Sequence, residues 1–136
     1  MPQATANHSR RVLIADDDAD IRALVLLALR NAGFCAETVD GGVEALAAAR
    51  REKREVLVLD VRMPDMSGLE VCRQLKAEAA DSQVLMISAD SSSEDVAAGY
   101  AAGADDYLPK PFSPRELVQR VALLVGRERD DTAPHS

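Results

Sequence analysis

The chain alternates short apolar runs with longer stretches that have helical periodicity. The apolar runs lie at residues 12–16, 35–39, 56–60, 84–88 and 107–109. Runs of this kind, separated by amphipathic segments, are typical of repeated βα units and a mainly parallel sheet. The runs at 12–16, 56–60 and 84–88 consist largely of Val, Leu and Ile, as expected for strands that are covered on both faces. The pattern therefore predicts strands and helices in strict alternation.

The stretches between the runs each predict a helix that packs on the sheet. The first is expected at residues 19–31, the second at 42–51, and the fourth at 94–102. The third begins at Ser67 and the fifth at Ser113. We expect the inward-facing residues to be Ile21, Leu24, Val25 and Ala28 in the first helix, Val43, Leu46 and Ala47 in the second, Cys72 and Leu75 in the third, Val96, Gly99, Tyr100 and Gly103 in the fourth, and Leu117, Val121, Leu124 and Val125 in the fifth.

Capping signals mark two of these helices clearly. Ser67 with Glu70, and Ser113 with Glu116, have the spacing of a capping box, in which the two side chains satisfy free backbone donors reciprocally. The fourth helix is the weakest, because a glycine inside a helix costs about 1 kcal/mol relative to alanine. Segments of low local stability are the ones that move when a protein changes conformation.

Length and composition indicate one globular domain with an aliphatic core. The chain has 136 residues, 47% of them hydrophobic, with no Trp, which is enough to bury an ordinary core. We expect a folded domain at residues 11–127, a flexible tail at 1–10, and a tail or linker at 128–136. No signal peptide or 18-residue apolar run is present in the sequence, so we expect a cytoplasmic protein with no membrane partner.

The charge distribution argues against a nucleic-acid-binding surface. The formal net charge is -7, whereas phosphate-backbone binding needs a concentrated stripe of basic residues. The basic cluster of Arg50, Arg51, Lys53 and Arg54 lies where a helix is expected to end, so we interpret it as solvated and favourable to the helix dipole. The two cysteines, Cys35 and Cys72, have no metal-binding spacing, and we expect both to be small buried hydrophobic residues.

Polar residues follow the predicted strands at the ends where chemistry is expected. Asp16 and Asp17 follow the first run, Asp60 and Ser88 end the third and fourth, and Lys110 follows the last. The carboxyl ends of parallel strands meet at one edge of the sheet, so these groups should converge there. A helix cap accounts for one acid, for which Asp18 or Asp20 suffices, but not for the rest. The set predicts a site for a divalent cation and a phosphoryl group.

The segment from Asp60 to Gly68 resembles the acceptor loop of response regulator receiver domains. That loop reads D-x-x-M-P-x-M-S/D-G, and the sequence Lys110, Pro111, Phe112 resembles the K-P-F turn of the same family, with a cis peptide bond before Pro111. The likeness extends over residues 11–127. It implies an α/β fold: a single doubly wound (βα)5 domain, with a flavodoxin-like parallel sheet in strand order 2-1-3-4-5.

The resemblance also implies a role for each residue of the predicted site. Asp60 would be the phosphoacceptor, charged from a phosphohistidine of a sensor histidine kinase or a histidine phosphotransfer protein. Mg²⁺ or Mn²⁺ would be bound by Asp17, Asp60 and the backbone carbonyl of Arg62, with Asp16 acting through water. The phosphoryl oxygens would be bound by Ser88, Lys110 and the backbone N–H groups of Arg62 and Ala89.

The family also has a switch and positions that influence dephosphorylation. Tyr107 matches the switch aromatic, which would turn inward as Ser88 moves toward the phosphoryl group. Taken alone, Tyr107 would be a half-buried strand residue. Serine at position 88 stands where threonine is commoner, and it lacks the methyl group that restricts the rotamer. Arg62 and Asp90 flank the site with opposite charge, and we expect an ion pair between them that slows hydrolysis.

The predicted function is that of a stand-alone receiver whose output comes through protein contacts. It would catalyse only its own phosphorylation and dephosphorylation, and it would signal through the face made by the fourth helix, the fifth strand and the fifth helix. That face would bind a downstream protein target or a second copy of the phosphorylated chain. A receiver separated from an output domain is an alternative, because residues from Arg127 onward resemble the start of a linker.

Two other classes share parts of this pattern. The acids at Asp16 and Asp18 resemble the D-x-D motif of haloacid-dehalogenase-type phosphatases, but there the lysine precedes the later acidic pair, whereas Asp105 and Asp106 precede Lys110 here. Turnover of a phosphate ester would support that class. A flavodoxin-like module shares the architecture, but its first loop cradles a phosphate, which the acidic loop here would repel. A yellow purified protein would support a flavin.

Overall fold

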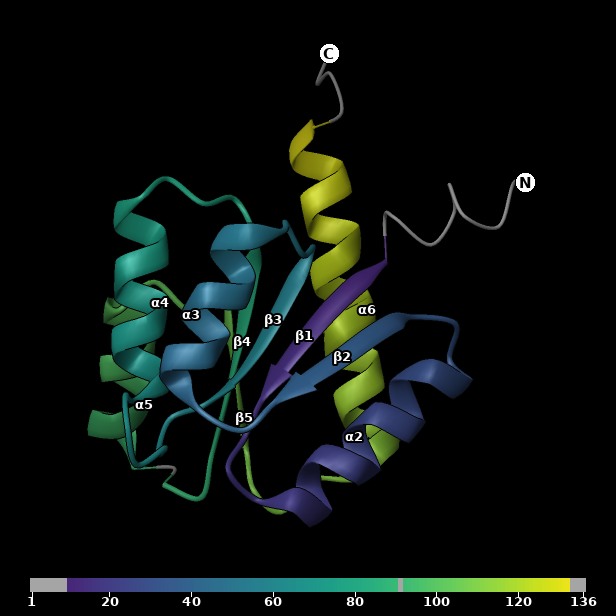
Figure 1. Ribbon diagram of the computed structural model, residues 1–136, viewed down its shortest axis with the longest axis horizontal. Helices are drawn as coiled ribbons and strands as arrows, with labels where there is room; N and C mark the ends of the chain where they lie inside the picture. The colour runs from purple at the N-terminus through teal and green to yellow at the C-terminus, as the bar shows by residue number, and fades with distance from the viewer. Residues whose placement is uncertain (1–9, 91, 133–136) are drawn as a thin grey trace.

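The apolar runs form a parallel sheet of five strands in the computed structural model, which describes residues 10–90 and 92–132, with side chains to residue 126 (Figure 1). The strands are β1 (Arg11–Ala15), β2 (Cys35–Val39), β3 (Val56–Asp60), β4 (Gln83–Ser88) and β5 (Asp106–Pro109). Their order is β2-β1-β3-β4-β5, which confirms the expected topology. Because the order reverses direction next to β1, the carboxyl ends of β1 and β3 lie at a switch point, where ligands bind in open α/β sheets.

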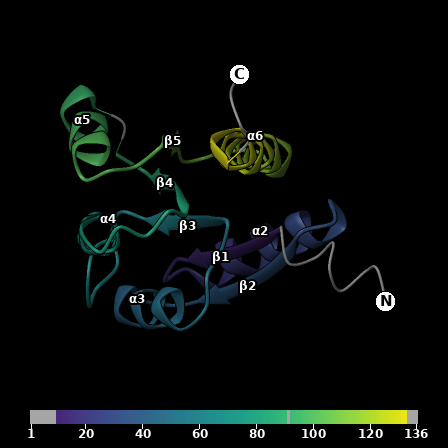
Figure 2. The same cartoon turned by 90° about the horizontal axis from the view of Figure 1, so that it is seen from above.

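Helices cover both faces of this sheet, and the sheet separates the core into two clusters (Figure 2). The helices are α2 (Ala19–Asn31), α3 (Gly42–Arg51), α4 (Gly68–Ala77), α5 (Ser93–Ala101) and α6 (Pro114–Thr132). One core cluster joins the sheet to α2 and α6 through residues such as Leu29 and Leu117. The other joins the opposite face to α3, α4 and α5 through residues such as Leu46 and Cys72. Burial on both faces explains why Val56–Leu59 of β3 and Val84–Ile87 of β4 are all apolar.

Side-chain caps fix where most helices begin. The Asp18 carboxylate accepts hydrogen bonds from the backbone N–H groups of Asp20 and Ile21 and so caps α2. Ser67 accepts from the Glu70 N–H at 3.1 Å, and Ser113 accepts from the Glu116 N–H at the same distance. The serine half of each predicted capping box is therefore confirmed, whereas the Glu70 carboxylate accepts from Arg73 and Gln74.

The predicted inner faces are correct for α4 and α6 and wrong in part for the other helices. Four residues expected inside are exposed: Leu24, Val43, Ala47 and Tyr100. In α3 the buried side is made by Ala45, Leu46 and Ala48 instead. Alanine fits either side of a helix, so an alanine-rich segment gives a weak apolar pattern, and the docking of the helix start decides which side is buried.

Two residues also differ from expectation. Cys72 is buried as predicted, but Cys35 is exposed because it opens the edge strand β2. Arg54, expected in a solvated cluster, is only 3% exposed. Its guanidinium donates through Nη1 to the carbonyl oxygens of Ala48 and Glu52 and pairs through Nη2 with Glu37, which compensates the buried charge.

The ends of the expected domain lie partly outside the described residues. The N-terminal tail, expected at 1–10, is described only at residue 10, and the last four residues of the C-terminal segment are not described. The backbone of α6 stays helical to Thr132, past the boundary expected at residue 127. Within the described ranges, every helix is too short or too polar to span a bilayer.

Candidate functional site

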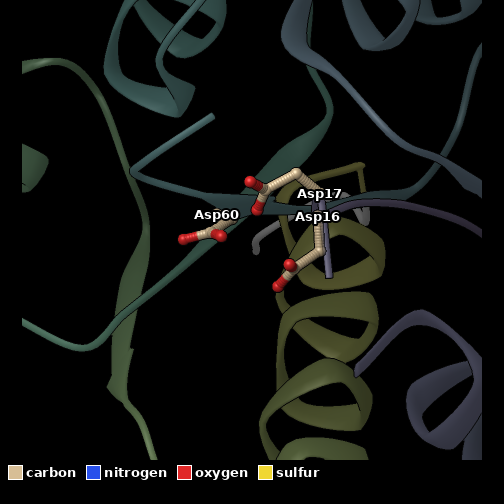
Figure 3. A group of neighbouring side chains, drawn as sticks. All are labelled: Asp16, Asp17 and Asp60. Carbon is tan, nitrogen blue, oxygen red and sulfur yellow. The ribbon is translucent and has the colours of Figure 1, made fainter. Parts of the chain in front are cut away.

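Three aspartates gather at the carboxyl edge of the sheet, where the sequence predicts a metal site (Figure 3). Asp16 and Asp17 follow β1, and Asp60 is the last residue of β3. Because Ala15 pairs with Leu59 in the parallel register, Asp16 and Asp60 lie side by side. One carboxylate oxygen from each aspartate lies within 4.8 Å of the others. Asp16 and Asp60 are buried, whereas Asp17 is exposed and forms the open side of the group.

Lys110 brings a positive charge to the same acids. Its Nζ atom lies 3.0 Å from Asp16 Oδ2 and 3.2 Å from Asp60 Oδ2. The backbone N–H of Lys110 donates to the Ser88 carbonyl oxygen at 2.8 Å, and the Lys110–Pro111 peptide bond is cis. Burial lowers the pKa of Lys110, but the carboxylates of Asp16 and Asp60 outweigh burial, so the pKa is raised overall and the ammonium stays charged.

The environment of Asp60 disfavours its charged form. Burial, and then the negative charge of Asp16, raise the pKa of Asp60 from its usual 3.8 to about 6. The Lys110 ammonium and the Arg62 N–H, which donates to Asp60 Oδ1 at 3.3 Å, act in the opposite direction. The net rise shows that one lysine does not neutralise the acids around it.

This imbalance makes the cluster suited to a hard divalent cation. Mg²⁺ prefers oxygen ligands and commonly binds through one or two carboxylates while it keeps several waters. Asp17 offers such an oxygen on the open side of the group and Asp60 offers one beside it, and the added positive charge would offset the burial and the Asp16 repulsion that raise the pKa of Asp60. The donor set therefore fits the ion expected from the sequence.

Asp90 is bonded to three other residues of the predicted site: Ser88, Tyr107 and Arg62. Its N–H donates to the buried Ser88 Oγ at 3.0 Å, and its carbonyl oxygen accepts from the Tyr107 hydroxyl at 2.7 Å. Its carboxylate pairs with the Arg62 guanidinium, as the opposite charges led us to expect. Arg62 and Asp90 belong to different loops, so their ion pair joins the loop after β3 to the loop after β4.

Tyr107 lies deeper than the sequence alone suggests. Its exposed fraction is 6%, so the expectation of a half-buried ring is wrong. The ring packs directly on α5: a Cβ atom added at Gly99 would lie 2.9 Å from the Tyr107 ring. The glycine that weakens α5 is therefore the residue that makes room for Tyr107.

The surface is hollowed beside Asp17 and beside Lys110. The first hollow, of about 550 Å³, is lined by Asp17, Val61, Arg62, Met63, Pro64, Ser67, Leu69, Asp90 and Asp95. The second, of about 400 Å³ and mostly apolar, is lined by Ile21, Leu24, Ala89, Lys110, Pro111 and Phe112. Ala89, expected to offer its N–H to a ligand, is exposed between Ser88 and Asp90.

Sequence reasoning missed Asp65, which makes several bonds in the loop that follows Asp60. Its carboxylate accepts from the N–H groups of Gly42 and Val43 at the start of α3, and from that of Met66. The signal available in the sequence is indirect: Gly41 precedes α3 without a capping side chain of its own.

Comparison with known proteins gives a consistent result. Residues 12–122 match the family described as "Response regulator receiver domain". Response regulator MprA of Mycobacterium leprae (strain TN) is 44% identical over 93% of this chain and 55% of the relative, so the chain spans about half the length of that relative. The BeF3-activated DrrB receiver domain is 36% identical with a TM-score of 0.78, covering 86% of this chain and 97% of that one. The receiver domain of a Francisella response regulator is 34% identical with a TM-score of 0.84, over 87% and 98%.

Proposed function

The chain belongs to the response regulator receiver domain family of two-component systems, and from that premise we propose that Asp60 accepts a phosphoryl group from a phosphohistidine. An Asp60 carboxylate oxygen forms the new bond to phosphorus while the bond from phosphorus to the imidazole nitrogen breaks. The imidazole keeps the electron pair of the broken bond. The phosphohistidine belongs to a sensor histidine kinase or to a histidine phosphotransfer protein. The only reactions catalysed are phosphorylation and dephosphorylation of Asp60 itself.

The observation that carries this proposal is that the Asp60 nucleophile lies among groups that could each bind a different oxygen of the phosphoryl group. Asp60 ends β3, and its carboxylate forms an ion pair with Lys110. Asp60 pairs with Ile87 in the sheet register, so Ser88, the next residue of β4, also lies close to it. The Ser88 oxygen already accepts from the Asp90 N–H, so its own proton is available for a phosphoryl oxygen. Lys110 and the N–H groups of Arg62 and Ala89 would bind the other oxygens.

A bound Mg²⁺, or Mn²⁺, would supply positive charge next to the reacting oxygens. We propose that Asp17, Asp60 and the Arg62 backbone carbonyl hold it directly and that Asp16 acts through water. Asp16 is already engaged by Lys110 and by the Asp18 N–H, which suits it to an indirect role. Lys110 keeps its charge throughout, because Asp16 remains its partner while Asp60 carries the phosphoryl group.

The readout would travel through Ser88 and Tyr107 to the face made by α5, β5 and α6. Phosphorylation replaces the single negative charge of the Asp60 carboxylate with about two on the phosphoryl group, and these draw the Ser88 hydroxyl and favour one position of the loop that carries Asp90. The Tyr107 hydroxyl is bonded to that loop, and its ring lies against Gly99 of α5. This face would bind a downstream protein, or a second phosphorylated copy, and no nucleic acid.

The Arg62–Asp90 ion pair would control how water reaches the aspartyl phosphate. Both residues line the larger hollow beside Asp17, which is the open side of the acid cluster. Removing the Arg62 side chain should widen this opening and speed hydrolysis. Equal lifetimes of the aspartyl phosphate in the native protein and in Arg62→Ala would contradict this role.

The phosphodonor protein would dock over the apolar hollow beside Lys110. Leu24, exposed on α2, and Phe112 both line it. Apolar side chains next to the nucleophile give a docking protein surface to bury without blocking the acids. This accounts for a leucine on the outside of α2, where the helical pattern predicts burial.

Incubation with acetyl phosphate and Mg²⁺, followed by intact mass measurement, tests the proposal. The native chain should gain the mass of one phosphoryl group, and Asp60→Asn should gain none. Omitting the metal should suppress the reaction. Two outcomes would overturn the proposal: phosphorylation that survives Asp60→Asn, or turnover of a phosphate ester in excess over protein, which would favour a phosphatase of the haloacid dehalogenase type.

A further inference from the structure

Helix α3 receives its N-terminal cap from a distant loop. Its N-cap residue, Gly41, has no side chain to offer. The Asp65 carboxylate takes that place, accepting from the Gly42 N–H at 3.0 Å and from the Val43 N–H at 3.1 Å. These bonds lower the pKa of Asp65, so the carboxylate stays ionised against the positive end of the helix.

The glycines at the start of α3 allow this close approach. A Cβ atom at Gly42 would lie 2.1 Å from the Met66 carbonyl oxygen, and one at Gly41 would lie 2.8 Å from Asp65 Oδ2. Gly41 has φ −156°, which any residue adopts, and Gly42 lies within a helix. The need for glycine here is therefore one of space rather than of backbone conformation.

The loop that docks on α3 is the one that carries the phosphoacceptor machinery. It leaves β3 at Asp60 and returns at Gly68, where the Gly68 N–H donates to the Val61 carbonyl oxygen at 3.0 Å. A Cβ atom at Gly68 would lie 2.3 Å from the Asp60 carbonyl oxygen, so the two ends are packed together. Between them, Arg62 donates its N–H to Asp60. The Asp65 bonds attach the far side of this closed loop to a separate helix.

We infer that Asp65 is a positioning residue, which holds the loop so that the main chain of Arg62 stays directed at Asp60. This inference rests on the proposed function, since Arg62 matters there as a ligand of the metal and of the phosphoryl group. Groups that orient the ligands of a metal typically change its affinity by 10- to 100-fold when they are removed. Asp65 acts three residues from Arg62, through the backbone, and touches neither the ion nor the phosphoryl group.

A pair of variants separates this role from simple capping of α3. Asp65→Ala removes both the cap and the attachment of the loop. Adding Gly41→Ser to Asp65→Ala gives α3 a cap of its own, because serine is a preferred N-cap residue and the space next to Gly41 is freed by the loss of the Asp65 side chain. The double variant therefore has a capped helix and an unattached loop.

The expected result is a separation of stability from metal binding. Asp65→Ala should melt at a lower temperature, bind Mg²⁺ about 10-fold more weakly by calorimetry, and react more slowly with acetyl phosphate. The double variant should recover the melting temperature but not the Mg²⁺ affinity or the rate. Amide hydrogen exchange of residues 62–66, measured without metal, should be faster in both variants than in the native chain.

Several outcomes would overturn the inference. Native Mg²⁺ affinity in Asp65→Ala, or recovery of affinity together with the melting temperature in the double variant, would reduce Asp65 to a helix cap. If serine fails to restore the melting temperature, Ser113→Ala, which removes the cap of α6, becomes the matched control. A loss of Mg²⁺ affinity in Ser113→Ala equal to that in Asp65→Ala would overturn the inference. Failure of the native chain to accept a phosphoryl group would contradict the proposed function instead, while the affinity and exchange measurements would still test Asp65.

Discussion

Replacing Asp60 by asparagine in the metal-free protein should stabilise the fold at neutral and alkaline pH. Asp60 is buried beside Asp16, and the attraction of Lys110 does not fully compensate for this environment. Ionisation of Asp60 is therefore less favourable in the folded state than in the unfolded chain, so the charged form lowers the free energy of unfolding. Asparagine has nearly the same shape and no charge, so it removes that cost and keeps an oxygen that can accept from Lys110.

The size of the effect follows from the pKa of Asp60. It is about 6 in the folded protein against a usual 3.8, and one pKa unit corresponds to about 1.4 kcal/mol. Above pH 6 the variant should gain at most about 3 kcal/mol over the native protein. Between pH 6 and 3.8 the folded protein binds the proton first, so the gain should shrink, to about half at pH 5, and vanish below 3.8.

Urea unfolding followed by circular dichroism, in the presence of a chelator, measures this gain at pH 8 and pH 5. Asp81→Asn is the matched control, because its side chain is 73% exposed and its surface pair with Lys53 should contribute little at either pH. Saturating Mg²⁺ should stabilise the native protein and not Asp60→Asn, reducing or reversing the difference. A variant no more stable than the native protein at pH 8, or a gain that does not shrink at pH 5, would refute the reasoning.

Three further predictions concern packing and reactivity. Gly42→Ala should destabilise the fold by about 1–3 kcal/mol, because the new methyl group meets a carbonyl oxygen, whereas Gly126→Ala, which meets nothing, should be neutral or stabilising in thermal unfolding. Tyr107→Phe should lose about 1 kcal/mol with the hydroxyl's hydrogen bond; unchanged urea unfolding would contradict that bond. A thiol reagent should modify exposed Cys35 readily and leave Cys72 unmodified, since burial raises the Cys72 pKa to about 11; two equally fast reactions would be inconsistent with the fold.

The alternation of elements and the acid cluster could be predicted because each depends on local sequence. Strand runs rich in Val, Leu and Ile, and acids directly after them, define the sheet edge once the strands are taken as parallel. Arg54 shows where this reasoning fails: it lies in the loop before β3, and its burial depends on Glu37 in β2 and on two carbonyl oxygens at the end of α3. Nothing near Arg54 in the sequence distinguishes it from its solvated neighbours.

Two of the errors on helix faces, at Val43 and Tyr100, have a similar cause. Val43 is exposed because the start of α3 is set by the attachment of the Asp65 loop, which turns Ala45 and Ala48 inward. Tyr100 is exposed because the neighbouring Gly99 provides the flat surface on which Tyr107 lies. In both cases a contact between distant segments overrides the helical pattern. The only indication of such a contact in the sequence is a glycine at the point of close approach.

Helix α6 gives the molecule a long rigid arm. It starts four residues after Lys110 and extends to Thr132, beyond the far end of the sheet (Figure 1). At a rise of about 1.5 Å per residue, the arm is roughly 28 Å long. A tilt of only about 5° at the end near the acids would therefore swing the opposite end by about 2 Å, so a small local event would be magnified mechanically over the length of the domain.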